Sequence, residues 1–218
     1  YVPGPCTHRP SSHESRGRAS EGKSFTSITL CRKLAERGKR VVLVDTDLRR
    51  SMITTVYGVQ FAPDSKKQGL SHYLAGIAEK EEVLFHTNVP GMDFIPMGHE
   101  LLNPIPLLSS ERFQNLLDGL AEQYDYVIVD AAPVGVVIDA AEIAKVCDGI
   151  LLVVSYNQVH RQELIDAKNQ LEQTGCPILG TILNQVDYEG FANKKYYYKS
   201  HYSSYYKAYE KEAEEKKS

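Results

Sequence analysis

The 218-residue sequence lacks several features that mark specialised classes of protein. Its longest apolar runs are strand-sized, whereas a membrane-spanning helix needs about 20 apolar residues, so we expect no such helix. Its formal net charge is only −3, which argues against nucleic-acid binding through bulk positive charge. The chain does not open with a charged segment followed by an apolar core, and we expect no signal peptide.

Cysteine is scarce and widely spaced. The four cysteines are Cys6, Cys31, Cys147 and Cys176, and no two of them form a C-x-x-C pair. This spacing indicates neither a zinc site nor a disulfide framework. A reducing, cytoplasmic compartment fits such a sequence best, and the length suits one α/β domain.

Short apolar runs alternate with helical patterns over most of the chain. Strands that are apolar throughout and separated by helices predict a doubly wound, mostly parallel sheet with helices on both faces. The predicted strands are residues 40–45, 92–97, 126–130, 149–155 and 178–184. The predicted helices are residues 24–35, 69–84, 139–146 and 161–175. A further helix, started by Ser109 or Ser110, is predicted from an apolar stripe at Phe113, Leu116, Leu117 and Leu120.

The two ends of the chain depart from this pattern. Residues 1–19 contain three prolines and no aliphatic run, and we interpret them as an irregular segment. Residues 194–218 contain no Leu, Ile, Val or Met and cannot contribute much to a core. We therefore expect the folded domain to span residues 20–193.

A phosphate-binding motif lies at the start of this domain. Residues 17–24, GRASEGKS, fit G-x-x-x-x-G-K-[ST]. In such a loop backbone N–H groups at Gly22 and a helix N-terminus cradle phosphate oxygens, Lys23 neutralises the outer phosphates and the Ser24 hydroxyl binds Mg²⁺. A short motif also arises by chance, so the prediction depends on support from elsewhere in the sequence.

Carboxylates at two strand ends supply that support. Asp45 follows four apolar residues, Asp47 comes two positions later, and Asp130 ends the apolar run YVIVD. Ligands of open α/β sheets bind at the carboxyl ends of the strands, where these side chains are expected. An aspartate after a strand is often only a turn former or helix cap, but three in this order with a phosphate loop favour a Mg²⁺-nucleotide site.

The combination of SEGKS, LVDTDLRR and VIVDAAP with a tyrosine-rich C-terminus resembles the bacterial tyrosine kinases (BY-kinases) of capsule and exopolysaccharide biosynthesis. The segments GLSHYLAG and NPIPLLSSERF extend the resemblance, and D-x-D-x-R is the family's Walker A′ motif. The resemblance implies a P-loop NTPase fold of the deviant-Walker type. The first strand and subunit-contact helix that are usual in the family are not recognisable in residues 1–19.

The resemblance also implies a role for each motif residue. Gly22, Lys23 and Ser24 would bind the phosphates of ATP, and Asn184 would read the adenine edge, although an Asn after a strand is often a turn residue. Mg²⁺ would be held by Ser24, Asp45 and Asp130. The residues implied in catalysis are Lys23, Asp45, which would accept the proton of the tyrosine hydroxyl, and Asp47.

The C-terminal segment holds half of the fourteen tyrosines of the chain. If the kinase interpretation is right, these are phosphoacceptors. They are Tyr196, Tyr197, Tyr198, Tyr202, Tyr205, Tyr206 and Tyr209. Five of them follow a helical spacing and could instead pack on the domain, and aromatic stacking on single-stranded nucleic acid is a further reading that the net charge does not favour.

The resemblance implies partners and a location. A cytoplasmic kinase of this size would be activated by a membrane protein of the polysaccharide co-polymerase type, at the inner face of the cell membrane. It would form a homo-oligomeric ring and modify enzymes of polysaccharide synthesis. Two alternatives remain open: a partition-type ATPase of the same fold, and a catalytically impaired protein whose tail is only a substrate or interaction segment.

Overall fold

The computed structural model describes residues 22–56, 61, 67–133, 139–156 and 158–186. Three predicted features lie outside the described residues. They are the irregular segment 1–19, the start of the phosphate motif from Gly17 to Glu21, and the tail 194–218. The described part contains eight helices and six strands. No helix within it is both long and apolar enough to pass through a bilayer.

The helices vary from single turns to four turns in length. Their bounds are α1 Lys23–Glu36, α2 Ile53–Val56, α3 Leu70–Leu74, α4 Lys80–Val83, α5 Ile105–Leu108, α6 Glu111–Ala121, α7 Asp139–Ala144 and α8 Arg161–Glu172. The strands are β1 Val41–Asp45, β2 Phe85–His86, β3 Met92–Ile95, β4 Tyr126–Asp130, β5 Ile150–Ser155 and β6 Ile178–Asn184.

The strands form two sheets. Four of them lie in the order β2-β3-β1-β4, with β1 parallel to both β3 and β4, and β2 antiparallel to β3 at the edge. The parallel pair β5-β6 forms a separate two-stranded sheet. The mostly parallel sheet predicted from the sequence is therefore confirmed.

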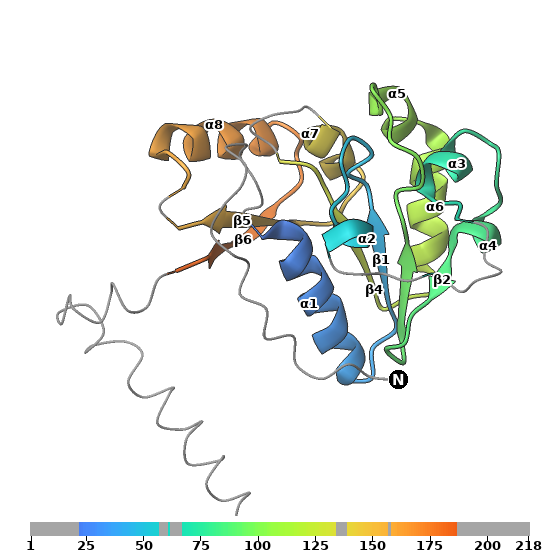
Figure 1. Ribbon diagram of the computed structural model, residues 1–218. Helices are drawn as coiled ribbons and strands as arrows, with labels where there is room; N and C mark the ends of the chain where they lie inside the picture. The colour runs from blue at the N-terminus through green and yellow to red at the C-terminus, as the bar shows by residue number, and fades with distance from the viewer. Residues whose placement is uncertain (1–21, 57–60, 62–66, 134–138, 157, 187–218) are drawn as a thin grey trace, which may run out of the picture.

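Strand β1 lies at the centre of the larger sheet and is buried on both faces. Val42 and Val44 pack into one core with Phe113, Leu116 and other residues of α6. Val41 and Leu43 point to the opposite face and pack with Cys31 and Ala35 of α1. Successive side chains of a strand alternate between faces, so an uninterrupted apolar run lets β1 bury both of its faces. Helices α1 and α6 cover these two faces and lie on opposite sides of the sheet in Figure 1.

Strands β4 and β5 are each paired on one side only in the described part of the chain. Their sequences are as apolar as that of β1, yet Tyr126 of β4 and Leu151 of β5 are exposed. A run of apolar residues is typical of an interior strand. These two strands therefore present open edges with a composition suited to the middle of a sheet.

The segment 69–84 differs from its prediction as one helix. It forms two short helices, α3 and α4, with Gly76 between them at a φ of +73°. That φ lies in the left-handed region, which glycine adopts without a steric penalty and which ends a right-handed helix. Three further elements, α2, α5 and β2, were not predicted from the sequence, and each is four residues or shorter.

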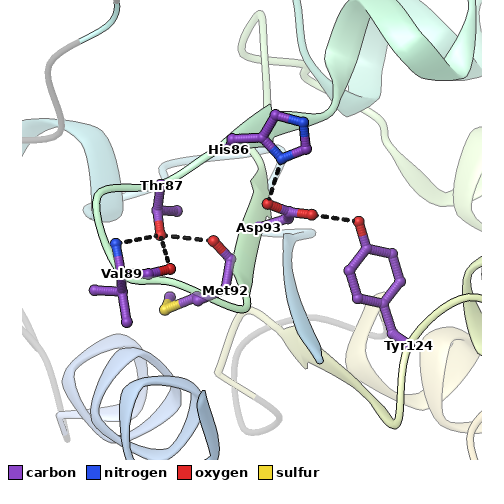
Figure 2. A network of polar contacts seen from close by, with 6 residues as sticks. All are labelled: His86, Thr87, Val89, Met92, Asp93 and Tyr124. Atoms are coloured by element: carbon purple, nitrogen blue, oxygen red, sulfur yellow. Dashed lines mark hydrogen bonds and ion pairs between the residues drawn. The ribbon is translucent and has the colours of Figure 1, made fainter. Parts of the chain in front are cut away.

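A polar network ties the β2-β3 hairpin to the chain that enters β4 (Figure 2). Asp93 of β3 bonds to Nδ1 of His86 at 2.7 Å and accepts a hydrogen bond from the Tyr124 hydroxyl at 2.6 Å. Burial, with Asp93 as acceptor, raises the pKa of Tyr124 above its usual range. Asp93 pairs with Val42, three positions before Asp45, so this network lies toward the amino ends of the parallel strands.

Helix α6 confirms the predicted apolar stripe. Phe113, Leu116, Leu117 and Leu120 are all buried, and the Ser110 hydroxyl caps the helix by accepting a hydrogen bond from the N–H of Phe113. The stripe is therefore the face that α6 contributes to the core.

Replacing Leu116, which is 1% exposed, by Ala should lower the free energy of unfolding by about 2–5 kcal/mol, because it removes apolar burial and leaves a cavity. The neighbouring Asn115 is exposed, and Asn115→Ala is the matched control, expected within about 0.5 kcal/mol of the parent. Urea denaturation measures both variants. Equal losses in the two would contradict this assignment of faces.

Candidate active site

The register between β1 and β4 sets two carboxylates side by side. Asp45 and Asp130 end their strands and are direct partners across the parallel pair. Asp45 is 0% exposed and Asp130 is 3% exposed. Two acidic groups thus meet at the carboxyl edge of the sheet, the position that the sequence predicted for them.

Asp130 is bound to the first turn of α1. The Ser24 hydroxyl donates to its Oδ2 at 2.7 Å and the Ser27 hydroxyl donates to its Oδ1 at 2.8 Å. Burial raises the pKa of Asp130, while these two hydroxyls and the charge of Lys23 oppose that rise. The predicted residues Lys23, Ser24 and Asp130 therefore lie together.

Asp45 is held by its own loop. The Ser51 hydroxyl donates a hydrogen bond to its Oδ2, and the N–H of Asp47 donates to Oδ1 at 3.3 Å. Burial raises the pKa of Asp45 from 3.8 to about 8, opposed by the Ser51 hydrogen bond and reinforced by the nearby Asp130. Asp47 is more exposed, and its Oδ1 accepts a hydrogen bond from the N–H of Arg50 at 3.1 Å.

Thr46, between the two aspartates, links the strand ends. Its N–H and its hydroxyl both donate to the carbonyl oxygen of Asp130, at 2.9 Å and 2.7 Å. The side chain is 1% exposed. These two hydrogen bonds to one carbonyl oxygen continue the β1-β4 ladder by one residue and hold the two strand ends together.

The start of α1 lies against the end of β6. Gly22 has a φ of +81°, and a Cβ at this position would lie 1.9 Å from Nδ2 of Asn184. The left-handed φ favours glycine here, and any larger residue would also have to displace the Asn184 amide. The structure thus brings the predicted Asn184 against Gly22, although the two residues are far apart in the sequence.

The donor set suits a magnesium nucleotide. Among the described residues, no group of three or more His, Cys, Asp or Glu side chains is arranged to hold a metal ion. Mg²⁺ is usually held by one or two carboxylates together with phosphate oxygens and water, rather than by a cage made only of protein. The Ser24 hydroxyl and the Asp130 carboxylate at a helix N-terminus fit that requirement.

Three residues of this site were not identified from the sequence: Ser27, Thr46 and Ser51. Ser27 lies one turn after Ser24 on the same face of α1, which is a usable signal. Thr46 lies inside the D-x-D motif, where the sequence pattern leaves its residue type open. No pattern points to Ser51. The predicted phosphoacceptor tyrosines lie outside the described residues.

The fold and these groups define a P-loop α/β protein of the nucleotide-binding class. A family model described as an AAA domain matches residues 17–175. The tyrosine-protein kinase CpsD of Streptococcus agalactiae serotype III is 38% identical over 170 residues, which are 78% of this chain and 72% of CpsD. The chain therefore belongs to the bacterial tyrosine-kinase family and is a homologue of the tyrosine-protein kinase CpsD.

Solved structures agree with this assignment. The kinase domain of the Escherichia coli tyrosine kinase ETK matches with a TM-score of 0.71 and 36% identity, covering 77% of this chain and 64% of that chain. The septum site-determining protein MinD from Pyrococcus horikoshii, which was solved with Mg-ADP, matches with a TM-score of 0.60 and 24% identity, covering 77% and 66%. The MinD comparison shows the shared fold.

The raised pKa of Asp45 predicts how stability depends on pH. Between its ordinary pKa of 3.8 and the folded value of about 8, the folded chain binds a proton that the unfolded chain has lost. The free energy of unfolding should therefore fall as pH rises through this window, by up to about 1.4 kcal/mol per pH unit from this group.

Asp45→Asn removes the titrating group and should be more stable than the parent at pH 8.5, with little difference near pH 4. Thermal denaturation across this range measures the effect. Asp118→Asn, at an exposed position of α6, is the control and should retain the pH dependence of the parent. An unchanged pH dependence in Asp45→Asn would contradict the burial argument.

Proposed function

We propose that this chain is an ATP- and Mg²⁺-dependent protein-tyrosine kinase that phosphorylates the tyrosine cluster of its own C-terminal segment and regulates capsule or exopolysaccharide biosynthesis. The observation that carries the proposal is the pairing of Asp45 with Asp130 at the carboxyl edge of the sheet, with Ser24 of α1 bonded to Asp130. Relatives with the name tyrosine-protein kinase support it at 38% identity.

The nucleotide would bind at the start of α1. Gly22 and the helix N-terminus would approach the phosphates, Lys23 would neutralise their charge, and Asn184 beside Gly22 would contact the base. Ser24 and Asp130 would hold Mg²⁺, with Asp45 close to it. When bound, Mg-ATP supplies the phosphoryl group, and the role of the chain is to position groups and to neutralise charge.

Asp45 would accept the proton of the attacking tyrosine hydroxyl. A phenol has a pKa of about 10, so a nearby carboxylate assists its attack by accepting the proton. Asp47, more exposed than Asp45, would position the incoming tyrosine or support the metal. Ser51 would hold the Asp45 carboxylate in place through its hydrogen bond.

The tail supplies the acceptors in this proposal. From Tyr196 to Ser218 there are five lysines and four glutamates, so the unmodified segment is nearly neutral. Each phosphate adds about −1.5 to −2 charges, and modification of all seven tyrosines would bring the segment past about −10. Repulsion between such tails would disperse a homo-oligomeric ring in which each tail enters a neighbouring site.

The proposed partners follow from the same family. The activator would be a membrane protein of the polysaccharide co-polymerase type, which would bring this chain to the inner face of the cell membrane. Enzymes of polysaccharide synthesis would be further substrates. A partition-type ATPase of the same fold would hydrolyse ATP without forming phosphotyrosine, and an impaired kinase would do neither.

The test is mass spectrometry of the purified chain after incubation with Mg-ATP. We expect several phosphates on tyrosines between Tyr196 and Tyr209, and none after Lys23→Ala, because that change removes the cation beside the phosphates. Lys33→Ala is the matched control, since Lys33 lies on the same helix with its side chain 67% exposed. ATP hydrolysis without phosphotyrosine would instead support the partition-type ATPase.

The host matters for this experiment. The variants must be produced in cells that lack other tyrosine kinases. Phosphotyrosine on Lys23→Ala made alone in such a host would rule out autophosphorylation, and a nucleotide titration of the parent chain distinguishes an impaired kinase from one that lacks its activator.

A further inference from the structure

Arg49 joins two segments that flank the carboxylates. Its Nε donates to Oδ2 of Asp139 at 2.6 Å and its Nη2 donates to Oδ1 at 3.1 Å, which is a bidentate pair. Its third nitrogen, Nη1, donates to the carbonyl oxygen of Leu102 at 2.8 Å. A planar guanidinium group holds two partners in this way because its donors lie in a rigid fork.

The carboxylate of this ion pair is buried, whereas the guanidinium group is partly exposed. Asp139 is the first residue of α7 and is 2% exposed, while the Arg49 side chain is 32% exposed. A carboxylate so deeply buried requires a partner, and Arg49 meets both of its oxygens. Asp47, the other acidic group that acts on Arg49, influences its pKa less than Asp139 does.

The three residues lie in segments that follow the carboxyl ends of three neighbouring strands. Arg49 follows β1, Leu102 follows β3, and Asp139 follows β4. In the sheet these strands are adjacent, in the order β3-β1-β4, and parallel, so their following segments leave from one edge. One side chain therefore links all three segments beside Asp45 and Asp130.

We propose that Arg49 is a positioning residue for phosphoryl transfer and that Asp139 is the residue through which it acts. We call the contacts of Arg49 with Asp139 and with the carbonyl oxygen of Leu102 the clamp. The clamp holds the segment that follows β1 against α7 and against the segment at Leu102. This inference rests on the proposed kinase activity. Neither Arg49 nor Asp139 touches the reacting groups in this account.

The expected effect is on rate rather than on nucleotide binding. Lys23 and Ser24 lie on a different element, α1, with Gly22 as its N-cap, so the affinity for nucleotide should change less than about threefold when the clamp is broken. A misplacement of catalytic groups by about 1 Å can cost about 100-fold in rate. Loss of the clamp should therefore lower kcat for tail phosphorylation by about 10- to 100-fold.

The test compares Arg49→Lys, Arg49→Gln, Asp139→Asn and the double variant Arg49→Gln/Asp139→Asn. Arg49→Lys keeps the charge but not the fork, and should still lose rate. The double variant should be no worse than the more impaired single variant, because both changes break one interaction. Arg50→Gln, at the exposed neighbouring position, is the control and should stay within about twofold of the parent.

Two results would overturn the proposal. If Asp139→Asn kept the parent rate while Arg49→Gln lost it, Arg49 would act directly on substrate. If the losses multiplied in the double variant, the two residues would act independently.

Hydrogen exchange separates failure of this proposal from failure of the kinase assignment. The amides of residues 46–51 and 139–144 should exchange faster in Arg49→Gln and in Asp139→Asn than in the parent, whether or not the parent forms phosphotyrosine. A parent chain that hydrolyses ATP without forming phosphotyrosine would contradict the proposed function, and hydrogen exchange alone would then test the Arg49–Asp139 pair. Unchanged exchange in both variants would refute the clamp.

Discussion

Parallel pairing of β1 with β4 is the constraint on which the rest of the site depends. It sets Asp45 opposite Asp130, and Thr46 extends the pairing with two hydrogen bonds to one carbonyl oxygen. A slip of one residue would turn every side chain of β1 to the other face, exchanging the α1 core with the α6 core. The apolar packing of β1 therefore fixes the relative position of the two carboxylates.

Burial of those carboxylates is costly, and hydroxyl groups offset part of that cost. Desolvation raises the pKa of both Asp45 and Asp130, since the charged form loses its hydration. Ser51 donates to the first carboxylate, and Ser24 and Ser27 donate to the second. The site thus retains two ionisable groups whose protonation can respond to a bound cation, in a framework of neutral hydrogen-bond donors.

Two strands, one in each sheet, show where composition and position disagree. Strands β4 and β5 have the apolar sequences of interior strands, but each is paired on one side in the described part of the chain. The strand that usually precedes the phosphate loop in this family is not recognisable in the sequence of residues 1–19. A polar or charged side chain usually protects an open edge of a sheet, and residues 127–129 of β4 contain only Val and Ile.

Local pattern was sufficient to predict the elements whose signals are long and periodic. The stripe of α6 and the apolar run of β1 were predicted correctly, because each repeats its own period over several residues. The prediction of one helix over residues 69–84 was wrong because Gly76 adopts a left-handed φ that the apolar spacing does not reveal. Elements of four residues or fewer, such as α2, carry too few positions to show a period.

The sequence by itself determined the order of the motifs, and hence which strand ends carry carboxylates and which helix starts at the phosphate loop. These features follow from neighbouring residues, since a strand and the residue that ends it are adjacent in the chain. Only the tertiary structure decided the partners of those groups. Ser27 meets Asp130 across 103 residues and Arg49 meets Asp139 across 90. Such contacts depend on the register of the sheet and the placement of α1 and α7, for which no local pattern provides a signal.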